Sequence, residues 1–173
     1  MAMSIKEISA VLDEIDFNHK LDEEDDLIYS AGGNSENTLA FFIRARENGE
    51  LFDMLARLLD DNRDQIDAKG SAHTNVLMSY LLLRNYQTKF GTWEFDSEDG
   101  TISFAVEIPL EDNNLTKKQL KRIVNLMMSA GEEAGNIKHI LAHGKLPLEG
   151  DDAAKKIAEL EAMLAKLQGA GSI

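Results

Sequence analysis

The chain has 173 residues, of which 43% are hydrophobic and 28% charged, an ordinary composition for one globular domain. It contains no cysteine, which excludes disulfides, thiolate metal sites and cysteine nucleophiles. Its formal net charge of −13 opposes binding to nucleic acid and anionic lipid, because both depend on lysine and arginine displacing counterions. The same charge favours basic or amphipathic polypeptide partners.

The acidity is concentrated in the first 70 residues, which hold 17 of the 31 acidic side chains and 7 of the 18 basic ones. No apolar run approaches the roughly 20 residues that span a membrane. The first residues also lack the basic and apolar regions of a signal peptide. We therefore expect a cytoplasmic protein that binds neither membranes nor nucleic acid.

The N-terminal residues predict a helix. Ser4 and Glu7 have the spacing of a capping box, and apolar residues recur at helical period from Ile5 to Ile15. The acidic run at 22–26 is predicted to be a solvated loop. A short strand is expected at 27–29, before a flexible Gly-Gly-Asn segment.

Residues 39–45 alternate between apolar and more polar side chains and lead to Asn48-Gly49, a strong hairpin signal. A two-residue turn there would place Arg44 opposite Asp53, although it would also set two glutamates opposite each other. In the alternative, residues 50–59 are helical and Asn48 caps the helix, with one apolar face made by Leu51, Met54, Leu55, Leu58 and Leu59. We favour the strand and expect any helix to be confined to the later residues.

From Ser71 to Tyr86 apolar residues recur at helical spacing. Two strands are expected next, at 90–96 and 101–110, joined by an acidic Ser-Glu-Asp-Gly turn. The second strand alternates as an antiparallel strand with one wet face does. Pro109 has no N–H to donate, so this end of the strand is predicted to lie at an edge of the sheet. Trp93 is predicted to be a core residue.

Thr116 and Gln119 again have capping-box spacing, and a long apolar stripe runs from there towards Gly144, a natural helix stop. We expect a domain over 1–145, a linker at 146–150, and a C-terminal amphipathic helix and tail at 151–173.

Two histidines could form half of a metal site. His139 and His143 are one helical turn apart, and Glu132 falls near the same face. No glutamate lies between the histidines, where a zinc protease carries its general base. In the simpler interpretation both are surface histidines whose protonation complements the helix dipole. We predict no metal site, with these three residues as weak candidates.

A basic cluster marks the start of the same helix, where the dipole does not favour positive charge. Its members are Lys117, Lys118, Lys121 and Arg122. They form either a solvated face or a contact with an anion or a partner. The acidic turn at 96–102 is not a calcium loop, because Val106 stands where a bidentate carboxylate is required. No nucleophile has an assignable base and no phosphate-binding loop is present, so we expect no catalytic residue, no cofactor and no enzymatic activity.

Short motifs occur in a fixed order between residues 80 and 116. They are a helix end, a hairpin opening, an acidic turn and a helix start: Tyr80-Leu81-Leu82-Leu83-Arg84-Asn85-Tyr86, Lys89-Phe90-Gly91-Thr92-Trp93-Glu94-Phe95-Asp96, Glu98-Asp99-Gly100, Ile108-Pro109-Leu110-Glu111-Asp112 and Leu115-Thr116. This series resembles the YbjN family, and the resemblance covers residues 5–143. The signature positions, which we expect to be structural, are Tyr80, Asn85, Tyr86, Phe90, Gly91, Trp93, Asp99, Gly100, Pro109 and Leu110.

The resemblance implies an α+β fold similar to that of type III secretion chaperones: a twisted antiparallel sheet of about five strands in two hairpins, packed against helices and commonly dimeric. Family proteins are described as sensory transduction regulators without an established activity, so no catalytic residue carries over. Our leading hypothesis is a non-enzymatic module, chaperone-like or regulatory and homodimeric, that captures a polypeptide segment. The alternative is a sensory regulator that responds to a small molecule or a metal.

Overall fold

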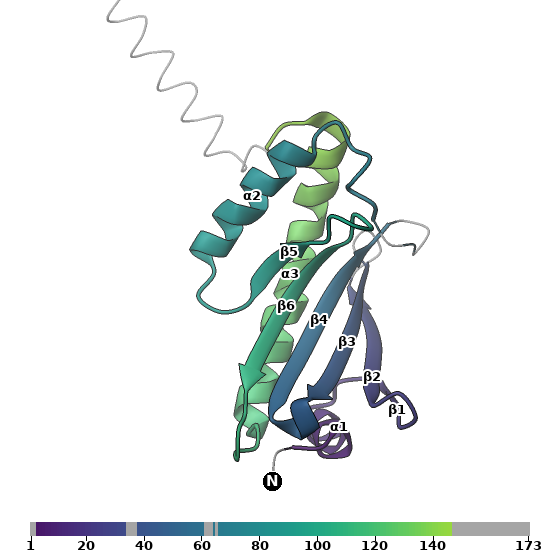
Figure 1. Cartoon of the computed structure of the whole chain (residues 1–173), viewed down its shortest axis with the longest axis vertical. Coiled ribbons are helices and arrows are strands. Elements are labelled where there is room, and N and C mark those ends of the chain that lie inside the picture. Colours follow the sequence, from purple (N-terminus) through teal and green to yellow (C-terminus); the bar gives the residue numbers. More distant parts are fainter. Residues whose placement is uncertain (1–2, 34–37, 61–63, 65, 147–173) are drawn as a thin grey trace, which may run out of the picture.

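The computed structural model describes residues 3–33, 38–60, 64 and 66–146. In these residues the chain forms one six-stranded antiparallel sheet and three α-helices (Figure 1). The sequence analysis expected about five strands, so the α+β architecture is confirmed with one strand more. The C-terminal helix predicted at 151–173 and nearly all of the predicted linker lie outside the described residues.

The strands follow the order β1-β2-β3-β4-β6-β5 across the sheet. Their bounds are β1 Lys20–Asp22, β2 Leu27–Gly33, β3 Thr38–Arg46, β4 Leu51–Leu59, β5 Thr92–Phe95 and β6 Ile102–Pro109. The helices are α1 Ile5–Glu14, α2 Thr74–Gln87 and α3 Lys117–His143. Both predicted capping boxes are present, at Ser4 and at Thr116, and α3 ends at Gly144 in the left-handed conformation.

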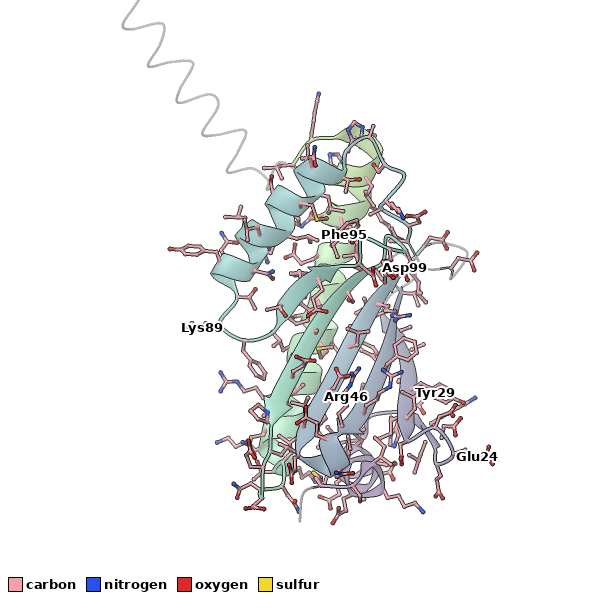
Figure 2. The ribbon with its side chains drawn as sticks, in the orientation of Figure 1. Glu24, Tyr29, Arg46, Lys89, Phe95 and Asp99 are labelled. Atoms are coloured by element: carbon pink, nitrogen blue, oxygen red, sulfur yellow. The ribbon has the colours of Figure 1, made fainter. Side chains whose placement is uncertain are left out.

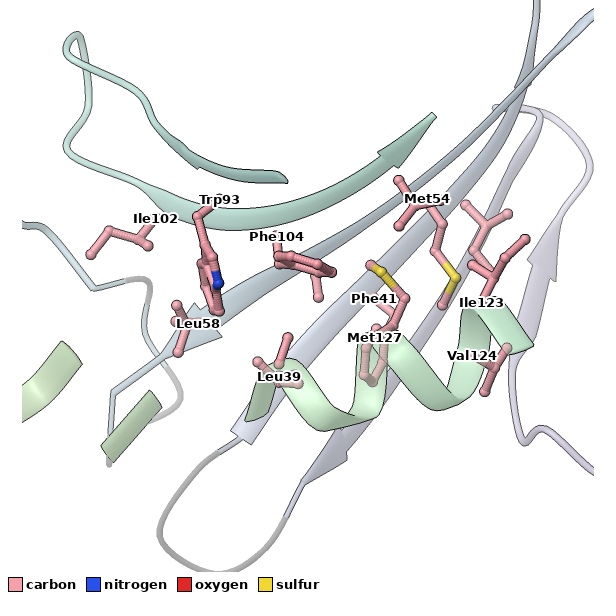
Figure 3. Close-up of a cluster of buried hydrophobic side chains, with 14 of the residues drawn as sticks. Leu39, Phe41, Met54, Leu58, Trp93, Ile102, Phe104, Ile123, Val124 and Met127 are labelled. Atoms are coloured by element: carbon pink, nitrogen blue, oxygen red, sulfur yellow. The ribbon is translucent and has the colours of Figure 1, made fainter. Parts of the chain in front are cut away.

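The three helices lie on the same side of the sheet, with α3 running along it and α2 beside β5 (Figure 1). Alternate residues of each strand point towards α3. Leu39 and Phe41 of β3, for example, pack with Met127 of α3 and are almost fully buried (Figure 3). Gly131 lets α3 approach closely, since a Cβ there would lie 3.2 Å from Leu39. The opposite side of the sheet has no described helix over it.

The strand that the sequence analysis did not identify is β1, which pairs with β2 from Lys20 to Asp22. It has three residues in an acidic stretch, too few to show a period. Its last residue, Asp22, accepts hydrogen bonds from the backbone of Glu24 and Asp25 at 3.1 and 3.3 Å. Most of the acidic run is therefore a hairpin turn, as the predicted loop implied.

Residues 51–59 form a strand throughout, so the alternative helix is wrong. Arg44 lies opposite Asp53, in the predicted register. The turn itself differs from the two-residue prediction, because the last pair is Arg46 with Leu51 and the connection contains a 3₁₀ turn, η1 Glu47–Gly49. The longer turn removes the glutamates from the ladder. Partners on both sides fix this strand, since β4 pairs with β3 and with β6.

Asn85 joins the end of α2 to the start of β5. Its side chain accepts a hydrogen bond from the Trp93 backbone N–H at 2.6 Å and donates one to the Trp93 carbonyl at 3.0 Å. An asparagine amide supplies both groups in the geometry of a strand neighbour. The short β5 is thereby held at both backbone groups of Trp93, whose side chain is buried against Phe104. Asn85 and Trp93, two of the signature positions, thus connect the end of α2 to the start of β5.

Candidate functional site

The side of the sheet that faces away from the helices, called the open face below, carries a row of apolar residues. Strand register places Tyr29, Phe42, Leu55 and Ala105 next to one another on four successive strands. Tyr29 is 40% exposed, and in Figure 2 it lies near the outer strands of the sheet. A sheet face that must remain in water usually carries polar residues. Phe42 and Leu55 are half-buried and Ala105 is buried, so the row is unusually apolar for such a face and is most exposed at Tyr29.

Charged side chains flank the apolar row on both sides. On one side Arg44, Asp53 and Glu107 lie opposite one another on β3, β4 and β6. Asp53 is 5% exposed and accepts a 2.8 Å hydrogen bond from Nε of Arg46. A buried carboxylate requires such a partner, because desolvation of an unpaired charge is costly. On this side, then, the charges are ordered rather than freely solvated.

On the other side of the row Arg57 stands opposite Ser103, which in turn stands opposite Glu94. The Arg57 guanidinium lies over the Phe42 ring, 5.3 Å from its centroid. Its Nε is buried and has no hydrogen-bond partner among the described residues. Buried polar groups are seldom left unpaired. Arg57 is also one of the residues that line a hollow of about 630 Å³ between β4, β6 and β5.

Glu94 is a carboxylate on this face whose pKa is raised. Partial desolvation raises its pKa, and the nearby carboxylates Glu107 and Asp53 raise it further. In the folded state the pKa of Glu94 thus lies above its value in the unfolded chain. Ionised Glu94 therefore lowers the stability of the folded state. This loss of stability is fully present at pH values above the folded pKa. It is absent below the pKa of the unfolded chain, about 4.3, where Glu94 is protonated in both states.

We expect Glu94→Gln to increase thermal stability slightly at neutral pH, within the roughly 0.5 kcal/mol typical of surface substitutions. The gain should disappear below about pH 4, where Glu94 is protonated in both states. Thermal unfolding of both proteins between pH 3 and 8 measures this. Glu24→Gln, in the exposed β1–β2 turn, is the control. A gain of equal size at pH 3 and pH 7 would contradict the electrostatic origin.

A polar network holds α2 against α3. Glu133 of α3 accepts hydrogen bonds from the Tyr80 hydroxyl and from the Arg84 guanidinium of α2. Asn136 donates to the same Tyr80 oxygen at 3.0 Å and to Glu133 at 3.1 Å. Burial and the adjacent Glu133 carboxylate raise the pKa of Tyr80 to about 12. The network fixes the helix that carries Asn85 and so supports β5.

The structure does not gather the candidate metal ligands into a site. The rings of His139 and His143 lie 4.6 Å apart, both on the exposed side of α3. Glu132 is nearly two turns earlier on that helix and lines a small pocket beside Arg84. No group of three or more histidine, aspartate or glutamate side chains in the described part of the chain could hold a metal ion.

The basic cluster at the start of α3 is exposed. Lys117 forms a 3.5 Å ion pair with Glu14 of α1, whereas Arg122 lines a pocket beside β6. Four signature positions are exposed, among them two large aromatic residues: Tyr86 is 89% exposed and Phe90 36%, and Asp99 and Pro109 are exposed too. No signal in the sequence indicated the roles of Arg57 and Glu133, because their partners lie on other elements. None of the described helices is long and apolar enough to cross a membrane.

Together these features define an α+β protein whose sheet is covered by helices on one side and presents an apolar, charge-flanked surface on the other. The chain belongs to the YbjN family, described as "Putative bacterial sensory transduction regulator", and the family model matches residues 4–136. No curated protein matches the chain. The matched residues include the whole sheet and most of α3, and the predicted family is confirmed.

Proposed function

We propose that this protein is a non-enzymatic regulator that captures a segment of a partner polypeptide on its open face. The observation that carries the proposal is the apolar row of Tyr29, Phe42, Leu55 and Ala105, left uncovered by the described helices. An ordered apolar surface with polar margins is typical of protein interaction sites. Membership of a family described as regulators is consistent with such a role.

The charges on the face indicate which segment would bind. The pKa of Glu94 is raised first by its partial desolvation and then by the nearby carboxylates of Glu107 and Asp53. A lysine or arginine of the partner placed between Glu94 and Glu107 would relieve the repulsion of these carboxylates. Apolar side chains of the same segment would cover Phe42 and Leu55. The partner segment is therefore amphipathic and basic, which also agrees with the net charge of −13.

The proposal can be tested by replacing Phe42 with the photoreactive residue p-benzoylphenylalanine and crosslinking in host cells. The crosslinked segment is identified by mass spectrometry and synthesised, and its affinity is measured by titration calorimetry. We expect a basic amphipathic peptide that binds the wild-type protein with a Kd in the micromolar range, about −8 kcal/mol.

Reversing the charge of carboxylates on the open face, and of the same number of carboxylates elsewhere, tests the role of these charges in binding. Glu94→Lys with Glu107→Lys should weaken binding of that peptide by about two orders of magnitude, since an attractive pair becomes repulsive at each position. Glu24→Lys with Asp25→Lys changes the net charge equally in the distant β1–β2 turn and should leave affinity nearly unchanged. If both variants lost the same affinity for the peptide, the effect would come from the overall charge of the protein and not from Glu94 and Glu107. Absence of any crosslinked polypeptide from Phe42 would refute the proposal.

A further inference from the structure

Within the described part of the chain, one half of β6 has a neighbouring strand on only one side. β5 pairs with β6 from Ile102 to Ala105, whereas β4 pairs with it as far as Pro109. In Figure 1 the lower part of β6 accordingly runs alone along the margin of the sheet, with α3 behind it. The edge predicted at Pro109 is present. A free strand edge offers unpaired backbone groups to another extended chain.

The orientation of β6 identifies the free groups. The N–H of Leu110 donates to the Glu50 carbonyl on the β4 side, at 2.6 Å, and the Thr101 carbonyl accepts from the Asp96 N–H on the β5 side, at 2.9 Å. Backbone groups of successive residues alternate between the two sides of a strand. The N–H and C=O of Glu107 therefore point to the side where β5 has ended. Pro109 points the same way but has no N–H, which limits pairing to a short segment.

A largely apolar groove of about 540 Å³ lies beside this free edge. We call it the edge groove. Phe90, from the loop between α2 and β5, lines it together with Ile108 of β6 and Ile123 of α3. Phe90 is 36% exposed although it is a large aromatic residue. Strand-like recognition combines main-chain pairing with a pocket for alternate side chains, and both parts are present here.

Basic residues outnumber acidic ones among the described residues that line the edge groove, where Glu107 is the one acidic residue, although the protein as a whole is acidic. Lys89 and Arg122 line it, and Lys118 precedes Arg122 by one helical turn. In Figure 2 Lys89 lies on the loop that precedes β5. None of these three side chains forms an ion pair with a residue in the described ranges. The first turn of α3 contributes further positive potential. These charges complement a carboxylate.

We propose that the edge groove binds a short extended peptide segment that contains an apolar residue next to an aspartate or glutamate. Its backbone pairs with Glu107, its apolar side chain packs against Phe90, Ile108 and Ile123, and its carboxylate meets Lys89 and Arg122. This site differs from the open face in position and in charge preference. It does not depend on the function proposed for that face.

The test uses the full chain and a phage-displayed library of random seven-residue peptides. Selected sequences should be enriched in an apolar residue adjacent to an acidic one. Arg122→Glu should weaken binding of the best synthetic peptide by about tenfold, the effect of losing roughly 1.4 kcal/mol of charge pairing. Phe90→Ala should also weaken binding of this peptide, because it removes part of the apolar surface against which the peptide's apolar side chain packs. Lys145→Glu, an equal charge change just beyond α3, should have little effect. Circular dichroism verifies that each variant is folded.

Strand pairing makes a distinct prediction about the peptide. Methylating its backbone nitrogens one at a time should abolish binding only at residues whose N–H faces Glu107, and not at their neighbours. The proposal would be overturned by selection of basic sequences, by no enrichment at all, or by peptides indifferent to Arg122→Glu. Self-association in sedimentation equilibrium that Arg122→Glu abolishes would instead assign the groove to a second copy of the chain.

Discussion

Replacing Gly91 by alanine is expected to lower the free energy of unfolding by about 3 kcal/mol, because a strained backbone and an overpacked core act together. Gly91 has φ +84°, a conformation that residues with a Cβ adopt at a cost. An added Cβ would lie 2.5 Å from the ring of Phe104, which is 2% exposed. That ring packs against Trp93 and cannot move aside without disturbing the core.

Urea unfolding followed by the fluorescence of Trp93, the single tryptophan, measures the change. Gly70→Ala is the matched control, because no atom of the described residues lies within 4 Å of a Cβ at that position and its φ is not positive. We expect its effect to remain within about 0.5 kcal/mol. If both glycines tolerated alanine equally well, the close approach of the loop to β6 described here would be incorrect.

Glu133→Ala is expected to destabilise the protein by about 2 kcal/mol, since it removes the acceptor for two donors at once. Arg84 would retain a largely buried guanidinium, whose Nε already lacks a partner among the described residues, and Tyr80 would lose its acceptor. The exposed fractions of the Arg84 and Glu133 side chains, 31% and 15%, place this pair between a surface ion pair and a fully buried one.

Glu132→Ala is the comparison, as it removes the same charge from the adjacent, exposed position of α3. Thermal and urea unfolding should separate the two variants clearly, with Glu132→Ala near the wild type. Hydrogen exchange should locate the loss in α2 and β5, because the network and Asn85 connect them. Uniform destabilisation without faster exchange in α2 would argue against a role in holding that helix.

Signals confined to a few neighbouring residues were read correctly from the sequence. Both capping boxes, the stop at Gly144 and the register that pairs Arg44 with Asp53 depend on side chains close together along the chain. Helical and strand periods likewise repeat within one element. The family was recognisable for the same reason, since its motifs follow in fixed order between residues 80 and 116.

The tertiary structure decided whatever depended on distant partners. Residues 51–59 are a strand because β3 and β6 lie on either side, and β6 begins more than 40 residues later in the chain. Glu133 meets Tyr80 and Arg84 across 53 and 49 residues of sequence.

Both candidate binding surfaces have this long-range origin. The apolar row of the open face combines single residues from four strands, and the edge groove combines the loop before β5, β6 and the first turns of α3. A linear sequence specifies each side chain and its local period. Which side chains share a surface depends on strand order and helix placement, which the packing of the whole core determines.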